Sequence, residues 1–296
     1  MLITILRNIV RQARRQPLYL ALNVIGLGLG MAVCLVLTLQ VRYEYSFNAS
    51  IPGAANVRRL DAHHMNPGNA PQENADVPFI AFPFLHTDFP QILATTRYET
   101  TDYQLRAGDR RVTADTAMVD PSFFDVITLK LERGNARTAL TRPNAIVLSA
   151  NTAQALFGTT NVLGRIITTD HEGRRVSQTV TGILARPGGP VTIRPDAVTP
   201  IPAYEMEKPQ FTRWGSSAGN IFVRVHHAAD RGVISQNLTR FVIDHASGDA
   251  NDDNSEGVHP ERHFGLSLVS LRETHFHDLQ VIGGDEATDR SVVNIL

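Results

Sequence analysis

The feature that most constrains this chain is an uncharged stretch of 24 residues near its N-terminus, residues 18–41. As an α-helix rising about 1.5 Å per residue it spans roughly 36 Å, enough to cross a hydrocarbon layer of ~30 Å with some tilt. Lipid offers the backbone no hydrogen-bond partner, so a helix is expected there. A cleaved signal peptide is the alternative, but its apolar region is typically about 7–15 residues and ends in a small-residue cleavage pattern. This stretch is longer and lacks that pattern, so we predict a retained transmembrane helix.

Charge is divided unevenly along the chain. Residues 1–42 hold five arginines and no acidic residue, and the remainder holds 23 basic residues (28 less these five) against all 29 acidic ones. The body has no basic excess, which argues against nucleic-acid binding. Four arginines precede the uncharged stretch, whereas Arg42 and Glu44 follow it and cancel. The positive-inside rule therefore predicts a cytoplasmic N-terminus and a body, residues 42–296, on the far side of the membrane.

Residues 1–17 have the spacing of an amphipathic helix. Apolar side chains gather on one face, and the opposite face carries Arg7, Arg11, Arg14 and Arg15. This pattern predicts an interfacial helix on the cytoplasmic membrane surface, with its arginines at anionic head groups. A basic flank that only sets the topology is the alternative. Within the span, Gly26 and Gly30 form a G-x-x-x-G pair, so we expect them to pack against another membrane helix.

The body is predicted to be mixed α and β, without disulfides because the only cysteine, Cys34, lies in the uncharged stretch. Strands are predicted over residues 57–60, 112–119, 145–148, 165–168, 176–184 and 221–225. Helices are predicted over residues 78–88, 151–157 and 230–245, the last with an apolar face of Val233, Ile234, Leu238, Phe241 and Val242. Residues 66–78 and 247–260 are predicted loops, and the proline-rich residues 186–202 a border between two lobes.

Histidines are the first candidates for a metal site. His275 and His277 would share one face of a strand, and His63–His64 and His226–His227 are adjacent pairs. Zinc needs three or four ligands at suitable spacing, and the chain has neither cysteines in its body nor an H-E-x-x-H motif. Structural histidines are the favoured interpretation.

Other chemical motifs are incomplete. The run from Asp249 to Asp253 begins like a calcium loop, but Asn254 stands where the turn glycine is required. A serine-hydrolase elbow and a nucleotide phosphate loop do not occur in the sequence. We therefore predict no enzyme activity, no cofactor and no bound metal.

Several short motifs follow one another along residues 6–184. The first three are Leu6-Arg7-Asn8, the run from Leu22 to Gly30, and Tyr43–Asn48. The body adds residues 88–90, 119–124, 131–135, 147–149 with Ala153, 156–158, 163–164 and 180–182. Together and in this order they resemble the MacB-like (FtsX-type) permease subunits of bacterial ABC transporters. Asn48 departs from the pattern, because an aspartate is commoner there.

The resemblance implies a place in the bacterial inner (cytoplasmic) membrane with the main domain in the periplasm, a membrane topology and a set of partners. Such permeases have four membrane helices, with the periplasmic domain between the first and the second; they dimerise and engage a separate cytoplasmic ATPase. The domain has two lobes, the second inserted in the first, which implies one lobe of residues 42–119 with 219–296 and another of residues 120–218. The sequence ends at Leu296, where the second membrane helix would begin, so the chain would be the N-terminal half of such a permease.

The sequence thus predicts an α+β fold, a single N-terminal transmembrane helix plus a two-lobed mixed α/β periplasmic domain. The predicted function is that of the N-terminal portion of an ABC transporter permease subunit, which couples a separate ATP-binding subunit to extracytoplasmic movement or substrate export. Its partners would be that ATPase, the membrane, and a second permease in a homodimer or heterodimer. A single-pass sensor or binding module and a membrane-anchored hydrolase remain as alternatives.

Overall fold

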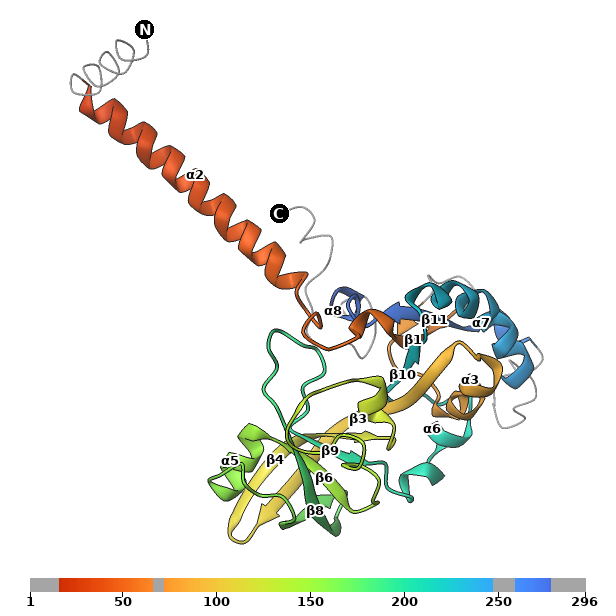
Figure 1. Ribbon diagram of the computed structural model, residues 1–296. Coiled ribbons are helices and arrows are strands. Elements are labelled where there is room, and N and C mark those ends of the chain that lie inside the picture. Colours follow the sequence, from red (N-terminus) through yellow and green to blue (C-terminus); the bar gives the residue numbers. More distant parts are fainter. Residues whose placement is uncertain (1–15, 66–71, 247–258, 278–296) are drawn as a thin grey trace. The chain divides into compact units, whose positions relative to one another are not determined.

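A computed structural model describes residues 16–65, 72–246 and 259–277 (Figure 1). The chain divides into two compact units. One reaches to Tyr45 and contains the apolar helix; the other begins at Ser46, contains all the described strands, and is called the body below. The predicted fold class, an apolar N-terminal helix and a mixed α/β domain, is confirmed.

Helix α2 (Pro17–Glu44) contains the whole of the predicted span. Pro17 stands in its first turn, where the missing N–H of proline costs nothing. The 28 residues extend over about 42 Å, and α2 is long and apolar enough to cross a membrane. The Thr38 hydroxyl donates to the Cys34 carbonyl (2.7 Å), so this polar group is satisfied within the helix. The predicted interfacial helix, with Arg7, Arg11, Arg14 and Arg15, lies outside the described residues.

The described strands of the body form one sheet of eleven strands, ordered β11-β1-β10-β3-β4-β9-β6-β8-β5, with β2 beside β1 and β7 beside both β3 and β8. Neighbours are antiparallel except β4 with β9 and β6 with β8, which run parallel. All six predicted strands are present. The strands are β1 (Val57–His64), β2 (Gln72–Asn74), β3 (Ile92–Ala107), β4 (Arg110–Val119), β5 (Leu131–Gly134), β6 (Ala145–Ser149), β7 (Ile166–His171), β8 (Arg174–Leu184), β9 (Ala197–Pro200), β10 (Asn220–Val225) and β11 (Phe264–Ser270).

Three helices cover the sheet: α7 (Arg231–Ala246) packs on β11, α3 (Phe82–Asp88) on β3 and α5 (Ala150–Phe157) on β4. The Ser149 hydroxyl accepts the N–H of Thr152 at the start of α5, and left-handed Gly158 ends that helix. The remaining helical segments are short: α4 (Phe123–Val126), α6 (Pro209–Thr212), α8 (Thr274–His277), and the 3₁₀ turns η1 (Ala54–Asn56), η2 (Phe79–Ala81), η3 (Glu205–Glu207), η4 (Ala228–Asp230) and η6 (Pro260–Arg262).

The predicted helices are confirmed with two adjustments. Pro83 does not break the helix near residues 78–88, because it falls in the first turn of α3 after the separate turn η2. Asp230, predicted as the first residue of the helix over 230–245, belongs to the turn in front of α7 instead: its carboxylate accepts the N–H of His227 at 2.9 Å.

Three hydrophobic clusters form the core of the body. One lies beneath α7 and includes Leu60, Ile221 and Phe241; a second lies beneath α5 and includes Leu148, Leu156 and Val180; a third surrounds Phe123 and includes Val119, Val198 and Phe222. Strand β3 contributes to all three, through Ile92, Tyr98 and Tyr103. One long strand therefore joins the separate parts of the core. The lobe borders near Asp120 and Gly219 stay a prediction.

Strand β3 itself is not predicted from the sequence. Its first part pairs with β10 and its end with β7, while β4 runs beside it from Tyr98 to Ala107. The burial of Thr95 and Thr96 interrupts the apolar alternation that marks a strand. The backbone hydrogen bonds of its neighbours hold β3 in place where its own side chains give a weak signal.

Two local predictions are wrong. Residues 66–78, predicted as a loop, contain β2, whose polar residues Gln72–Asn74 pair with the end of β1. His275 and His277, predicted on a strand, lie in the helical turn α8. The border predicted over residues 186–202 also contains a strand, the buried β9 between β4 and β6, and Pro200 stands at its end. Of the predicted loop over residues 247–260, only the last two residues are described.

Phe241 and Val233 provide a matched test of the core. Phe241 is 2% exposed, whereas Val233, predicted on the same apolar face of α7, is 47% exposed. Phe241→Ala is expected to lower the free energy of unfolding by about 3–5 kcal/mol, because it leaves a large cavity. Val233→Ala is expected to change it by less than about 0.5 kcal/mol. Urea unfolding of the chain in detergent micelles, followed by the fluorescence of Trp214, measures both, and equal losses would contradict this packing.

Candidate functional site

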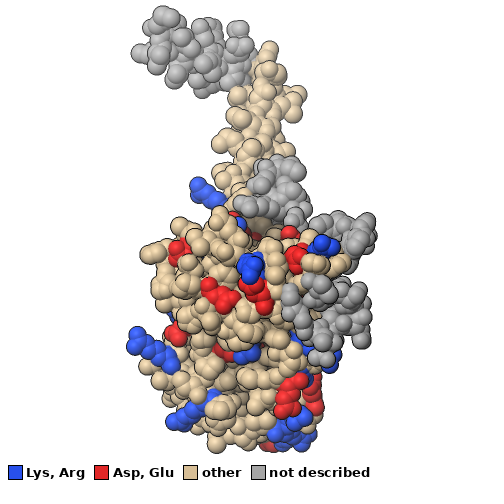
Figure 2. Space-filling view, turned by 90° about the vertical axis from the view of Figure 1, so that its right-hand side faces the viewer, with Lys and Arg blue, Asp and Glu red and all other residues tan. Residues whose placement is uncertain are grey.

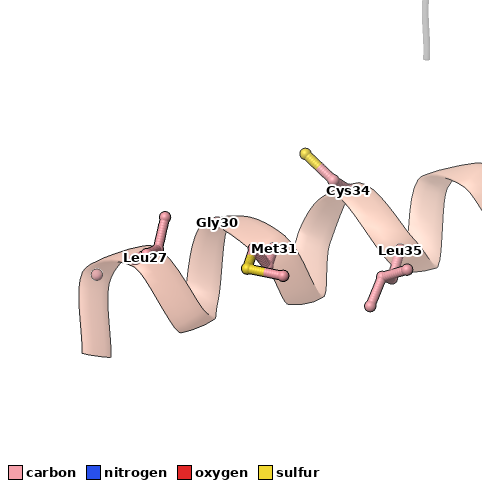
Figure 3. Close-up of a pocket in the computed structure, with 6 residues that line it drawn as sticks. Leu27, Gly30, Met31, Cys34 and Leu35 are labelled. Carbon is pink, nitrogen blue, oxygen red and sulfur yellow. The ribbon is translucent and has the colours of Figure 1, made fainter. Parts of the chain in front are cut away.

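The predicted helix-packing residues Gly26 and Gly30 lie on one exposed face of α2. No atom lies within 4 Å of the position that a Cβ would take at either glycine. Leu27, Met31, Cys34 and Leu35 line the shallow groove that the two glycines leave, and Figure 3 shows bare backbone at Gly30 between the side chains of Leu27 and Cys34. The backbone of a second helix would fit closely along such a groove.

Exposed apolar side chains are concentrated on α2. In the part of the chain that the structure describes, large hydrophobic residues with exposed side chains run along the whole helix, from Leu18 at 75% to Tyr43 at 53%. Figure 2 shows the helix free of charged side chains over most of its length, while basic and acidic side chains alternate on the visible face of the body. The helix surface suits lipid or another helix, and the body surface suits water.

Asn48 holds together the first residues of the body. It is fully buried and adopts a left-handed backbone, φ 58°, which asparagine tolerates better than most residues. Its amide nitrogen donates to the Leu271 carbonyl (2.7 Å) and to Thr192 Oγ1 (3.0 Å), and its amide oxygen accepts the N–H of Thr192 (2.9 Å). Its own N–H donates to the Pro190 carbonyl (3.0 Å). One side chain thus joins three segments that are far apart in the sequence.

The neighbouring residue strengthens this joint. The Phe47 ring stacks on His275 of α8, with ring centroids 3.5 Å apart and planes 3° from parallel. The Thr274 hydroxyl donates to the same Leu271 carbonyl that Asn48 contacts (2.9 Å). The segment that begins the body, directly after α2, is therefore fixed to the end of the described body by an aromatic stack and by hydrogen bonds.

The structure does not bring the predicted histidine pairs together. His275 stacks on Phe47, whereas His277 lies 3.0 Å from the carboxylate of Glu73 and 3.4 Å from that of Asp61. His227 belongs to the turn in front of α7. Two residues apart on a helical turn, His275 and His277 point in different directions.

Residues of the family-like motifs mostly shape the backbone. The Asp120 carboxylate accepts the backbone N–H of Arg97 (2.7 Å) and two guanidinium N–H groups (3.0 and 2.5 Å). The Ser122 hydroxyl donates to the Thr95 carbonyl (2.6 Å). Gly134 has φ 95°, and a Cβ there would stand 2.5 Å from the Thr181 carbonyl oxygen, so only glycine fits. These motifs fasten strands and turns to one another.

A group of charged side chains lies where the β7–β8 turn meets η3. We call His171, Glu172, Glu205 and Lys208 the histidine–glutamate cluster. Lys208 Nζ lies 2.8 Å from Glu205 Oε2 and 3.2 Å from both carboxylate oxygens of Glu172. His171 Nε2 lies 3.9 Å from one oxygen of each glutamate. The sequence analysis missed this cluster, because the two halves are more than 30 residues apart and match no ligand motif.

Burial and neighbouring charges shift the pKa values of several groups in and beside the cluster. Burial raises the pKa of Glu99, and the charge of nearby Glu205 raises it further. Burial would lower the pKa of Lys208, but its ion pairs with Glu205 and Glu172 outweigh that effect and raise it. The hydrogen bond from Lys208 in turn lowers the pKa of Glu172. The raised pKa of Lys208 and the lowered pKa of Glu172 both favour the charged forms of this ion pair.

Comparison with known proteins agrees with this architecture. The model of the MacB-like periplasmic core domain matches residues 20–241, well over half of the chain. A domain from Porphyromonas gingivalis, described as part of a permease, is similar with a TM-score of 0.59 at 17% identity, and the match covers 83% of this chain and 97% of that one. The likeness shows a shared fold.

Two further solved structures are more distant. The periplasmic region of MacB from Actinobacillus actinomycetemcomitans has a TM-score of 0.47 at 17% identity, covering 79% of this chain and 97% of that one. The extracellular domain of the noncanonic ABC-type transporter YknZ from Gram-positive bacteria has a TM-score of 0.44 at 15% identity, covering 72% and 100%. No curated protein sequence matches the chain.

The family match begins inside α2 and ends inside α7, so it includes most of the apolar helix, Asn48 with its partner Thr192, and most of the sheet. This family is a domain of transporter permeases and is not a known class of enzyme. The chain belongs to the family of MacB-like periplasmic core domains, which are parts of ABC transporter permeases.

Proposed function

We propose that this chain is the N-terminal portion of an ABC transporter permease subunit in the bacterial inner membrane. In this role α2 crosses the membrane with its N-terminus in the cytoplasm, and the body works in the periplasm. A separate ATPase drives movement that α2 passes to the body, for the export of a substrate. The observation that carries the proposal is the family match over residues 20–241, which joins an apolar helix and a folded body in one module.

The Asn48 joint supports a mechanical role. Force that reaches the body through the chain after Tyr45 first meets Asn48 and Phe47. Their contacts pass it to Thr192 and Leu271 by hydrogen bonds and to His275 by ring stacking. Because several short bonds share the load, the body would move as a unit and the linking segment would not unravel.

The groove at Gly26 and Gly30 supports pairing with another permease helix. Lipid does not drive two apolar helices together, so association depends on close packing and on small residues that permit it. Cys34 lies one turn beyond Gly30 and lines the same groove. The proposed partner is a second copy of this chain or a related permease subunit.

Purification from the native membrane tests the proposed function. The intact chain, extracted in mild detergent, is expected to retain a subunit that hydrolyses ATP, because the permease and its ATPase form one complex. The matched control is the body alone, residues 46–296, exported to the periplasm; it should retain no ATPase, since it lacks the helix that reaches the cytoplasm. Recovery of a signalling protein without ATPase activity would favour the alternative of a single-pass sensor.

Oxidative cross-linking tests the packing face, because Cys34 is the only cysteine of the chain. In membranes treated with a mild oxidant, the chain is expected to form a disulfide-linked dimer, because Cys34 lines the proposed packing face and would lie near Cys34 of the second copy. Gly30→Leu is expected to reduce the dimer at least five-fold by filling the groove. Gly28→Leu is the control, because position 28 lies about 200° around the helix from Gly26 and Gly30. Equal dimer yields in the two variants would rule out this face.

Unfolding measurements test the Asn48 joint. Asn48→Leu removes every side-chain hydrogen bond and strains the left-handed backbone, so we expect the free energy of unfolding to fall by about 3–5 kcal/mol. Asn48→Gly keeps the backbone conformation and should lose about 2–3 kcal/mol. Exposed Asn237 on α7 is the control, and Asn237→Ala should cost less than about 0.5 kcal/mol. If Asn48→Gly were as stable as the native chain, the side-chain hydrogen bonds of Asn48 would not stabilise the joint.

A further inference from the structure

The histidine–glutamate cluster has the donor set of a metal site. His171 and Glu172 stand at the turn between β7 and β8, and Glu205 begins η3. One imidazole nitrogen and one carboxylate oxygen from each glutamate lie within 4.8 Å of one another. We propose that His171, Glu172 and Glu205 bind a divalent transition-metal ion of the Zn²⁺ type, in competition with the ammonium group of Lys208.

Glu205 is the strongest indication of a ligand. Its side chain is 1% exposed, and its Oε1 has no hydrogen-bond donor in the described part of the chain. Lys208 forms an ion pair with Oε2 at 2.8 Å, whereas His171 Nε2 lies 3.9 Å from Oε1, too far for a hydrogen bond. A buried carboxylate oxygen without a donor costs free energy. A cation between Oε1 and His171 would satisfy both atoms at once.

His171 is held in an orientation that suits coordination. Its side chain is 10% exposed, and its ring stacks on Tyr103 with centroids 4.5 Å apart and planes 8° from parallel. Tyr103 is buried in the cluster beneath α5. The stack fixes the plane of the imidazole, so Nε2 points toward Glu172 and Glu205 and little conformational entropy is lost on binding.

The ligand types favour zinc over calcium or magnesium. Imidazole nitrogen with carboxylate oxygen suits Zn²⁺, whereas Ca²⁺ takes six to eight oxygen ligands. Bonds of 2.0–2.1 Å in a tetrahedron place ligand atoms about 3.3 Å apart. The two separations of 3.9 Å therefore have to shorten by about half an ångström, and the three donor atoms already lie within 4.8 Å of one another. Glu172 can move, since its side chain is 54% exposed. Three protein ligands leave a fourth position for water.

Lys208 is the built-in competitor. Its ammonium group contacts both carboxylates that would bind the metal, and its side chain is 33% exposed, so it can turn into solvent. A metal ion and this ammonium group neutralise the same negative charge. Removal of the lysine charge should therefore strengthen metal binding, whereas a cluster that is only structural would gain no metal affinity from the loss of Lys208. The two interpretations therefore predict different results for the same substitution, a gain in zinc affinity or no gain.

Zinc titration of the full chain in detergent tests the proposal. The chain carries no polyhistidine tag, is stripped of metal, and is titrated with Zn²⁺ against a colorimetric chelator. We expect one tight equivalent for the native chain, a loss of affinity of at least ten-fold for His171→Asn, and a gain of at least three-fold for Lys208→Gln. His259→Asn is the control, because exposed His259 pairs with Glu261 alone in the described part of the chain and should not change the tight equivalent.

A second variant separates the loss of a zinc ligand from a loss of folding. Glu172 is exposed in a turn, so Glu172→Gln should fold normally, as near-ultraviolet circular dichroism will show, and should still lose at least five-fold in zinc affinity. Equal binding by the native chain, His171→Asn and Glu172→Gln would overturn the proposal, and so would weaker binding by Lys208→Gln. The inference does not rest on transport, so its failure would leave the permease assignment intact.

Discussion

The proposed membrane role depends on one physical constraint, which is that lipid offers a backbone no hydrogen-bond partner. A stretch of 24 uncharged residues can satisfy its N–H and C=O groups in lipid only as a helix, and the structure has that helix as α2, a unit of its own. Its exposed apolar side chains would be unfavourable in water, while the body hides its apolar residues in three clusters. The chain thus combines two elements built for different solvents.

The proposed mechanical role would require a rigid body, and β3 connects much of the body's core. This strand contributes Ile92, Tyr98 and Tyr103 to three separate hydrophobic clusters and pairs with β10, β4 and β7 along its length. Displacement of one cluster would therefore strain the strand that the others share. The Asp120 carboxylate adds three hydrogen bonds to Arg97 in the middle of β3. Movement at the Asn48 joint would in this way reach distant parts of the sheet.

The sequence predicts elements whose signal is local and misses those that depend on distant partners. Helix α2, α5 with Ser149 and Gly158 at its ends, and six strands follow from hydrophobic spacing and turn residues. Strand β3 is not predicted because buried threonines replace apolar residues in it. Strand β2 is not predicted because its three polar residues form a strand only by pairing with β1. The proposed metal site is missed for the same reason, because its ligands are distant in the sequence. Glu205 lies near His171 only because η3 packs against the β7–β8 turn.

The residues behind the family resemblance and those behind the metal proposal are different, and this separates fold from chemistry. Asp120, Ser149 and Gly134 fasten or shape the backbone. None of the four residues of the histidine–glutamate cluster belongs to a family-like motif. A family fold can be kept by its backbone-shaping residues while a pair of loops acquires ligands of its own. Zinc binding at His171, Glu172 and Glu205 would then be a property of this chain, added to a scaffold that stands without it.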